Sequence, residues 1–182
     1  MMSMADTVRL VLVLPSIDDA DAVWKYRAVD WQTREYIPGS SGLGRAKSYA
    51  EWLAQSQTRR EAAGVVDNLV PSTVYLAKRV SDNKLIGMVD IRHSLNDYLR
   101  AAGGHIGYSV HPEFRRQGYG TEILELALEK CRELGIDPVL VTCDRDNTAS
   151  SRVILANGGV LENETIDGGG VIKRRYWIKL SN

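Results

Sequence analysis

The sequence predicts an α/β fold of the α+β type, in which a mixed, mostly antiparallel sheet of about seven strands is flanked by about four helices. Three observations predict it. Short runs of β-branched and aliphatic residues alternate with longer stretches whose apolar residues recur at helical spacing. Proline and glycine separate these runs, and no linker, repeat or low-complexity tract interrupts them. The 182 residues suffice for one full-sized core, so we expect a single domain over residues 1–182.

The boundaries of the expected elements come from local signals. Ser16 with Asp19 three places later forms a capping box, which opens a helix after Pro15. Gly135 occupies the place of a left-handed helix C-cap. The expected order is strand 8–15, helix 16–35, loop 36–44, helix 45–64, strands 72–80 and 84–93, polar connection 94–104, strand 105–110, helix 120–135, strand 138–144, helix 147–159 and strands 160–166 and 171–180.

Charge and cysteine content exclude several functional classes. The 23 basic and 23 acidic residues cancel, so no long-range field selects for nucleic acid or an anionic membrane. No apolar run approaches the roughly 18 residues that span a bilayer, and the N-terminus lacks the regions of a signal peptide. Two cysteines, Cys131 and Cys143, are too few for a disulfide framework or a metal cluster. We therefore expect buried, reduced thiols in a cytoplasmic protein without a metal.

The segment VHPEFRRQGYG, residues 110–120, has the parts of an anion site. It joins a strand to a helix, and the first backbone N–H groups of a helix have no internal partner and lie at the positive end of its dipole. Gly118 and Gly120 leave room for a phosphate near the backbone, and Arg115 and Arg116 add charge-assisted hydrogen bonds. A helix cap with solvated arginines is the alternative. The Walker loop and the dinucleotide fingerprint are both missing.

The motif Val-x-Pro-x-x-Arg-x-x-Gly-x-Gly that begins at Val110 resembles the acetyl-coenzyme A signature of the GNAT superfamily of N-acetyltransferases. A second segment, DRDNTASSRVILANGGV, is similar to the Asn-x-x-Ser-x-Arg helix that follows the next strand in that family, and here it begins at Asn147. The order of strands and helices also fits over nearly the whole chain. In detail the chain resembles bacterial acetyltransferases related to the ribosomal-protein N-acetyltransferase branch.

The resemblance implies an acetyl-CoA-dependent N-acetyltransferase that needs no metal and transfers acetyl directly to a primary amine. It also implies that strand 105–110 splays from its neighbour, so that a backbone N–H near Ser109 or Val110 faces the thioester oxygen. Helix capping is the alternative role for Asn147 and Ser150 to cofactor binding. The cofactor-binding residues that it implies are Ser109, Val110, Arg115, Arg116, Gln117, Gly118, Tyr119, Gly120, Thr121, Asn147 and Ser150.

Acetyl transfer to an amine requires removal of a proton, and few residues are candidates for this task. His105 begins the strand that carries the signature, and its ordinary pKa suits a general base. Asp90 lies on the preceding strand, where a regular β-strand turns it away from His93. A bound water is a further possibility. The place where many family members carry a tyrosine as general acid holds Ile154, and Tyr108 and Tyr176 are candidates to reach the sulfur instead.

The acceptor is expected at the first two helices and their loop, where Trp31, Tyr36, Trp52 and the glycine-rich loop PGSSGLG could form a lid and His93 borders the same cleft. Tryptophans at helical spacing are also typical of a core, and the charged run Arg59, Arg60 and Glu61 is expected on a solvated face. The residues do not identify the acceptor amine. The rival functions are an acyl-CoA-binding regulatory module without turnover, a transferase for another acyl group, and an unrelated nucleotide-phosphate binder. A homodimer is a mild expectation from the resemblance.

Overall fold

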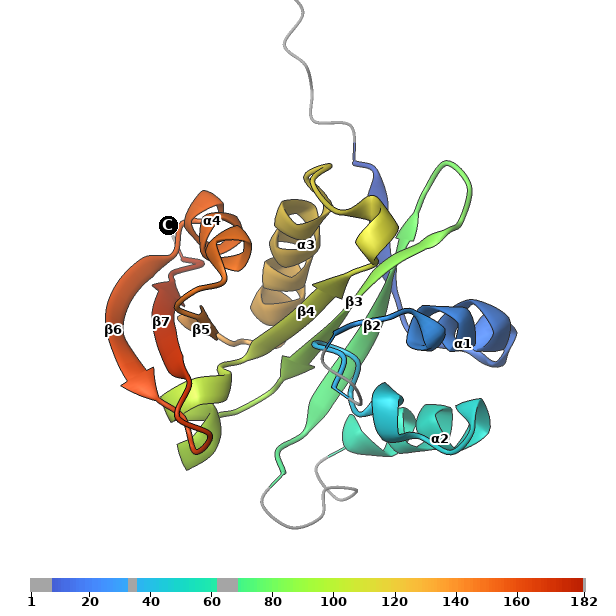
Figure 1. The fold of residues 1–182 in the computed structure, drawn as a ribbon, viewed down its shortest axis with the longest axis horizontal. Coiled ribbons are helices and arrows are strands. Elements are labelled where there is room, and N and C mark those ends of the chain that lie inside the picture. The colour runs from blue at the N-terminus through green and yellow to red at the C-terminus, as the bar shows by residue number, and fades with distance from the viewer. Residues whose placement is uncertain (1–7, 33–35, 62–68, 182) are drawn as a thin grey trace, which may run out of the picture.

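The computed structural model describes residues 8–32, 36–61 and 69–181. Seven strands and four α-helices occur in these residues, which confirms the expected fold class (Figure 1). In chain order they are β1 Leu10–Val13, α1 Ala20–Ala28, α2 Tyr49–Arg59, β2 Ser72–Arg79, β3 Leu85–Arg92, β4 Ile106–Val110, α3 Tyr119–Glu133, β5 Val139–Asp144, α4 Thr148–Ala156, β6 Val160–Ile166 and β7 Ile172–Ile178.

The strands form two antiparallel sheets that meet at one junction. The larger sheet has the order β1-β2-β3-β4, and the smaller has the order β5-β7-β6. Figure 1 shows the two sheets side by side, with β4 and β5 at their junction. Within the described residues no ladder joins β4 to β5. One backbone hydrogen bond connects them, from the His105 N–H to the Leu140 oxygen at 2.7 Å.

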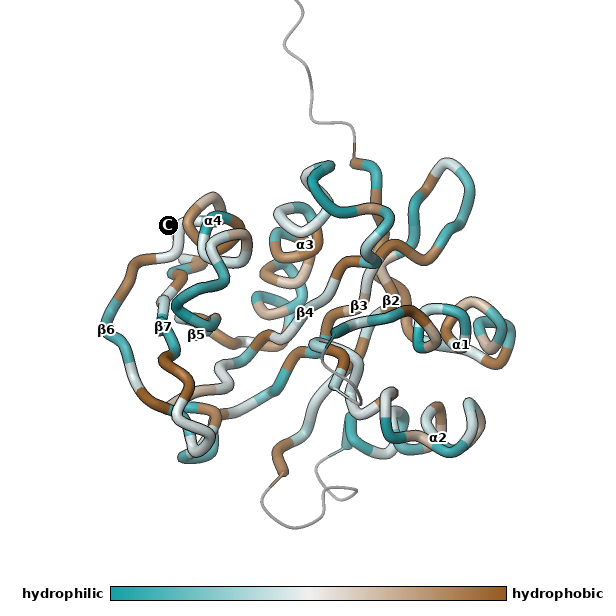
Figure 2. Tube along the Cα trace, in the orientation of Figure 1, coloured by the Kyte–Doolittle hydropathy of each residue, from teal (hydrophilic) through white to brown (hydrophobic). Residues whose placement is uncertain are grey.

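Side chains alternate across the larger sheet, and helices cover both of its faces. On one face α1 and α2 pack over β2 and β3, and their core includes Tyr26, Trp52 and Met88. On the other face α3 contacts β1, β3 and β4, and its core includes Ile123 and Val139, which extends to the smaller sheet. In Figure 2 the turn that joins β2 to β3 is hydrophilic, whereas hydrophobic residues run along these strands.

The helix expected over 16–35 is shorter than predicted. The capping box of Ser16 and Asp19 is confirmed, and it opens a 3-10 turn, Ile17–Asp19, that leads into α1. Helix α1 ends before Val29, whose backbone is extended. The Trp31 indole N–H donates to the Tyr26 oxygen at 2.9 Å, so this tryptophan satisfies a carbonyl at the helix end. Trp31 therefore continues the helical spacing of the apolar residues because it caps the helix and is buried, although it lies beyond the end of α1.

The connection expected over 94–104 contains a π-helix, Leu99–Gly103, which the sequence did not predict. Leu99 and Ala102 are buried on one side of it. The Gly104 N–H donates to the Leu99 oxygen at 2.6 Å and closes the turn. This small element lies between β3 and β4, so its position decides where β4 begins.

Cys131 and Cys143 are free and buried, as predicted. Burial raises the pKa of the Cys131 thiol to about 12, so the thiol stays protonated at neutral pH. No helix in the described part of the chain is long and apolar enough to cross a bilayer.

Candidate active site

The start of α3 presents a row of backbone N–H groups without partners. Gly118 is the N-cap of the helix and adopts a left-handed conformation with φ of 81°. The Gly118 carbonyl is the first to accept a hydrogen bond within the helix, from the Glu122 N–H. Within the described residues, none accepts a hydrogen bond from the N–H groups of residues 118–121. Arg115 and Arg116 are exposed beside this row. The arrangement is suited to binding an anion with backbone and guanidinium donors together.

The backbone at the start of α3 is braced from the opposite side by Arg9. The Arg9 guanidinium lies 4.3 Å from the centroid of the Tyr119 ring and donates to the Gln117 oxygen at 2.9 Å. Glu122 accepts the Arg9 Nε at 3.0 Å and the backbone N–H groups of Arg9 and Leu10. Tyr119 is 5% exposed, so its side chain belongs to the core. Only its backbone faces the anion site.

The free edge of β4 continues this donor surface. The Arg92 N–H donates to the His105 oxygen and the His111 N–H donates to the Ile86 oxygen, which fixes the ladder between β3 and β4. Because an antiparallel ladder alternates, the N–H groups of Tyr108 and Val110 point to the opposite edge, toward β5. Neither has an acceptor among the described residues. These two N–H groups lie on the same strand edge that leads into the start of α3.

Helix α4 lies on the other side of the junction and carries the second predicted motif. The Asn147 side-chain Oδ1 accepts from the Ser150 backbone N–H at 3.1 Å, so Asn147 caps the helix. The Ser150 hydroxyl is 3.0 Å from the Tyr108 hydroxyl. The Asn157 amide donates to the Thr121 oxygen at 3.2 Å and holds the end of α4 against the start of α3. Both motifs are thereby held together beside β4.

Tyr108 and Ser109 point to opposite faces of the sheet, although they are neighbours in the chain. Tyr108 faces α3 and α4, and burial raises the pKa of its phenol to about 12. Ser109 is 7% exposed and faces α1, where its hydroxyl is 2.8 Å from the Tyr26 hydroxyl. No local pattern indicates this pair, because Tyr26 lies 83 residues from Ser109 in the chain.

His105 holds the two sheets together. The ring Nδ1 of His105 accepts from the Leu140 backbone N–H at 2.9 Å, and the backbone N–H of His105 donates to the Leu140 oxygen. Because Nδ1 accepts this hydrogen bond, the proton of the neutral ring is on Nε2. The Nδ1 lone pair is then occupied and Nε2 has none, so the ring has no lone pair with which to take a proton from a substrate. Burial, together with the charges of Arg100 and Arg92, lowers its pKa to about 4. This bonding favours a structural role over the predicted role of general base.

The low pKa of His105 predicts acid sensitivity. The unfolded chain binds a proton near pH 6.5 and the folded chain only near pH 4, so unfolding is favoured as the pH falls through this range. We expect up to ~3 kcal/mol of stability to be lost between pH 7 and pH 4 through this group. Urea unfolding at several pH values measures it, with His105→Gln as the comparison. Equal pH slopes in the two proteins would contradict the expectation.

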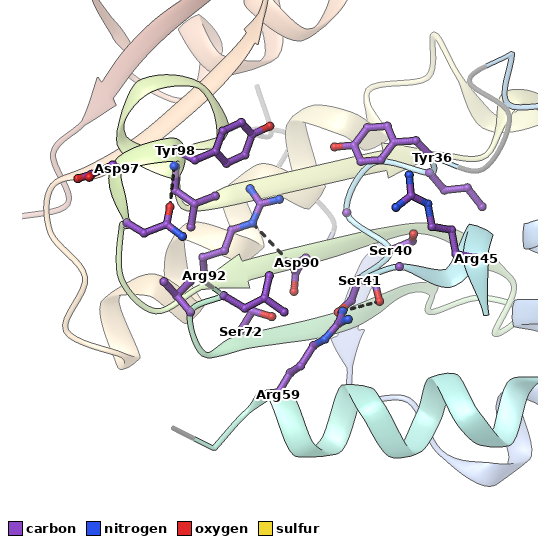
Figure 3. Close-up of a pocket in the computed structure, with 17 residues that line it drawn as sticks. Tyr36, Ser40, Ser41, Arg45, Arg59, Ser72, Asp90, Arg92, Asp97 and Tyr98 are labelled. Atoms are coloured by element: carbon purple, nitrogen blue, oxygen red, sulfur yellow. Dashed lines mark hydrogen bonds and ion pairs between the residues drawn. The ribbon is translucent and has the colours of Figure 1, made fainter. Parts of the chain in front are cut away.

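On the opposite face of the sheet, a cavity of about 780 Å³ opens between the loop after α1, the ends of β2 and β3, and the π-helix. Asp90 is one of the three predicted catalytic residues and lines it (Figure 3). Loop residue Gly39 also lines it and packs against β4, where a Cβ added at Gly39 would lie 2.5 Å from the Gly107 oxygen. The cavity therefore borders the backbone of β4 from the side opposite to α3 and α4.

Asp90 is 6% exposed, and its pKa is raised by burial, which the positive charge of Arg92 partly offsets. Its Oδ2 lies 3.6 Å from the Arg92 Nε. Its Oδ1 is buried and has no hydrogen-bond partner in the described part of the chain. Figure 3 shows Asp90 between Arg92 on one side and Arg59, bonded to Ser41, on the other. The prediction of a solvated face is wrong for Arg59, because its guanidinium turns inward to the loop.

The residues predicted to contact the acceptor lie at different places in the structure, and only some of them line the cavity. Tyr36 lines the cavity, with its hydroxyl end pointing toward that of Tyr98 in Figure 3. Trp31 is buried under Arg115 and near His111, at the other end of β4. The His93 Nε2 is 2.8 Å from the Thr73 hydroxyl, and His93 does not line the cavity. The His111 ring lies near the rings of Tyr26, Trp31 and Phe114.

Comparison with known protein families identifies the family of this chain. The family model described as acetyltransferase (GNAT) domain matches residues 9–160. The chain belongs to the GNAT acetyltransferase family. No match was found among curated proteins. The GNAT signature predicted from residues 110–120 therefore lies in the family's own domain, and the expected enzyme class, an N-acetyltransferase of this family, is shown.

Solved structures share this GNAT fold at low identity. The ribosomal-protein-S5-alanine acetyltransferase from Vibrio fischeri is 17% identical, with a TM-score of 0.68 over 97% of this chain and 96% of that one. RimL, a ribosomal L7/L12 α-N-protein acetyltransferase solved with coenzyme A, is 18% identical, with a TM-score of 0.66 over 95% of each chain. The microcin C7 self-immunity acetyltransferase MccE, solved with acetyl-CoA and AMP, is 15% identical, with a TM-score of 0.68 over 96% and 94%.

Proposed function

We propose that this GNAT protein transfers the acetyl group of acetyl-CoA directly to a primary amine of a small molecule or a protein. The observation that carries the proposal is the row of unbonded N–H groups at residues 118–121, which lies beside Arg115, Arg116 and the free edge of β4. A pyrophosphate on this row and a pantetheine arm along β4 would satisfy these donors. Two solved relatives contain acetyl-CoA or coenzyme A, which supports this choice.

The proposed donor site uses the residues predicted from the two motifs. The backbone N–H groups of residues 118–121 bind the pyrophosphate, with Arg115 and Arg116 as charged partners. Gln117 takes part through its backbone, because its side-chain amide donates to the Glu113 oxygen. The Val110 N–H donates to the thioester oxygen. Asn147 and Ser150 position the thiol end from α4, and their capping contacts hold them in place.

The chemistry follows from the two faces of β4. Asp90 takes a proton from the ammonium form of the acceptor, directly or through water, and the raised pKa of its carboxyl suits this task. The neutral amine attacks the thioester carbon, the carbon–nitrogen bond forms, and the Val110 N–H stabilises the oxyanion. The carbon–sulfur bond then breaks, and the coenzyme A thiolate takes a proton from the Tyr108 hydroxyl, which is protonated at neutral pH. The amide nitrogen gives up its second proton, which restores the Tyr108 hydroxyl through water, and Asp90 releases its proton to solvent. Ile154 lies in the core and takes no part.

Calorimetric titration of acetyl-CoA into wild type and an Arg115→Ala, Gly120→Ala double variant tests the donor site. A Cβ at Gly120 would lie 3.4 Å from Val153, so the alanine fits the protein but fills space beside β4. Loss of one charge-assisted pair and of backbone access is expected to weaken binding by about 10- to 100-fold. Arg132→Ala, at the far end of α3, is the matched control and should bind like wild type.

The outcomes separate the rival functions. If folded wild type binds no acyl-CoA, the segment is a helix cap and the proposal fails. If it binds acetyl-CoA but releases no coenzyme A with any amine, the protein is a regulatory module. A series of acyl-CoAs identifies a preference for another acyl group.

A further inference from the structure

The cavity at Asp90 carries charges of both signs. Arg59 and Arg92 line it together with the carboxylate of Asp90. Its volume of about 780 Å³ lies in the range of small-molecule sites, which is roughly 300–1,000 Å³. Fixed charges of both signs in a concave site favour a ligand that carries complementary charges of both signs.

Asp90 supplies a place for a hydrogen-bond donor. A buried carboxylate oxygen without a partner is costly, and the Oδ1 of Asp90 has none in the described residues. The Arg92 guanidinium does not satisfy it, because its NH1 donates to the Gly103 and Gly104 oxygens at 3.0 and 3.3 Å. Its Nε is 3.6 Å from the other oxygen, beyond hydrogen-bond distance. A ligand ammonium or amine is the donor that fits a carboxylate.

Arg59 supplies a place for an anion. Its NH1 donates to the backbone oxygen and the hydroxyl of Ser41, both at 2.8 Å. These bonds fix the guanidinium at the cavity wall, and its Nε and NH2 donate to no acceptor within the described residues. A guanidinium stays charged and offers paired donors that match the oxygens of a carboxylate or phosphate.

We infer that the acceptor is a small amine that also carries an anionic group, with the amine at Asp90 and the anion at Arg59. This inference rests on the proposed function and narrows its substrate class. An internal lysine or a protein N-terminus supplies the amine without a neighbouring anion, and leaves the remaining donors of Arg59 without an acceptor. An α-amino acid and an aminoalkyl phosphate supply both groups.

Steady-state coenzyme A release from acetyl-CoA tests the inference with matched acceptors. Each of a panel of α-amino acids is compared with its own amide, and ethanolamine phosphate is compared with ethanolamine. We expect the anionic member of at least one pair to show a kcat/KM at least tenfold higher. The amino acid and phosphate arms distinguish the two anions. Equal or better use of the amides and of ethanolamine, or exclusive use of peptide N-termini, would overturn the inference and leave the proposed function standing.

The Arg59→Gln variant locates the anion, with Arg60→Gln as the matched control, because Arg60 is adjacent but does not line the cavity. Arg59→Gln should raise KM for the anionic acceptor at least tenfold and leave its amide unchanged. An equal loss for both would contradict the inference. Melting curves confirm that the variants fold.

A binding measurement keeps the inference testable without turnover. Thermal-shift titration of the preferred amino acid, its amide and its deamino acid is made on wild type, Arg59→Gln and Asp90→Asn. Wild type should be stabilised most by the amino acid, Arg59→Gln should lose this advantage over the amide, and Asp90→Asn should lose it over the deamino acid. No stabilisation of wild type by any panel member up to high millimolar concentration overturns the inference. Absent acetyl-CoA binding would instead overturn the proposed function.

Discussion

Replacing Trp52 by alanine is expected to lower the free energy of unfolding by about 3–5 kcal/mol, the largest stability effect that we predict. Trp52 in α2 is fully buried at the centre of the core between α1, α2 and β2. Its indole N–H donates to the Ser40 oxygen at 2.9 Å, so the change also removes one of the two hydrogen bonds that this carbonyl accepts, the other coming from the Leu43 N–H. Urea denaturation at pH 7 measures the loss.

Two further variants separate the effect of the lost apolar volume from the effect of the lost hydrogen bond, and compare a buried tryptophan with a partly exposed one. Trp52→Phe keeps most of the apolar volume and removes the hydrogen bond, so its loss should be intermediate. Trp24→Ala removes a partly exposed indole under Arg27 and should cost less than about 1.5 kcal/mol. A loss below 1.5 kcal/mol for Trp52→Ala would show that this core does not depend on the indole.

Replacing Gly39 by alanine is expected to reduce acetyl transfer at least tenfold and to destabilise the fold by about 1–3 kcal/mol. The Cβ would lie 2.5 Å from the Gly107 oxygen and 2.6 Å from the Tyr108 Cα, and both are backbone atoms that cannot move aside. The φ of 71° adds strain. The loop must therefore separate from β4 and distort the cavity. Coenzyme A release and thermal unfolding measure the two effects.

Gly135→Ala is the matched control for this change. Its φ of 72° gives the same backbone strain, but no described atom lies within 4 Å of its Cβ, and it does not line the cavity. A similar loss of activity in both variants would mean that strain alone matters and that the contact with β4 does not.

The sequence predicted most elements of this fold because their signals are local. The capping box at Ser16 and the Gly118–Gly120 segment depend on residues within a few positions of one another. The end of α1 was placed too late, since Trp31 continues the helical spacing while serving as a cap for Tyr26. The π-helix Leu99–Gly103 has no periodicity of its own and depends on packing.

The candidate site was predictable only where a motif carries it. The motif residues of α3 and α4 meet beside β4 in the structure, but the contacts that define single side chains are long-range. The partner of His105 is Leu140, 35 residues away, and this contact decides which ring nitrogen carries the proton. Arg59 is positioned by Ser41, 18 residues away, from a helix whose charge run resembled a solvated surface. No local pattern contains this information.

The opposite orientations of Tyr108 and Ser109 have a kinetic consequence. The proposed donor approaches β4 from the side of α3 and α4, and the proposed acceptor approaches from the side of α1 and the loop. Neither substrate then obstructs the route of the other, so a ternary complex can assemble in either order. Initial-rate plots should intersect rather than run parallel, and coenzyme A and the acetylated product should leave by separate exits.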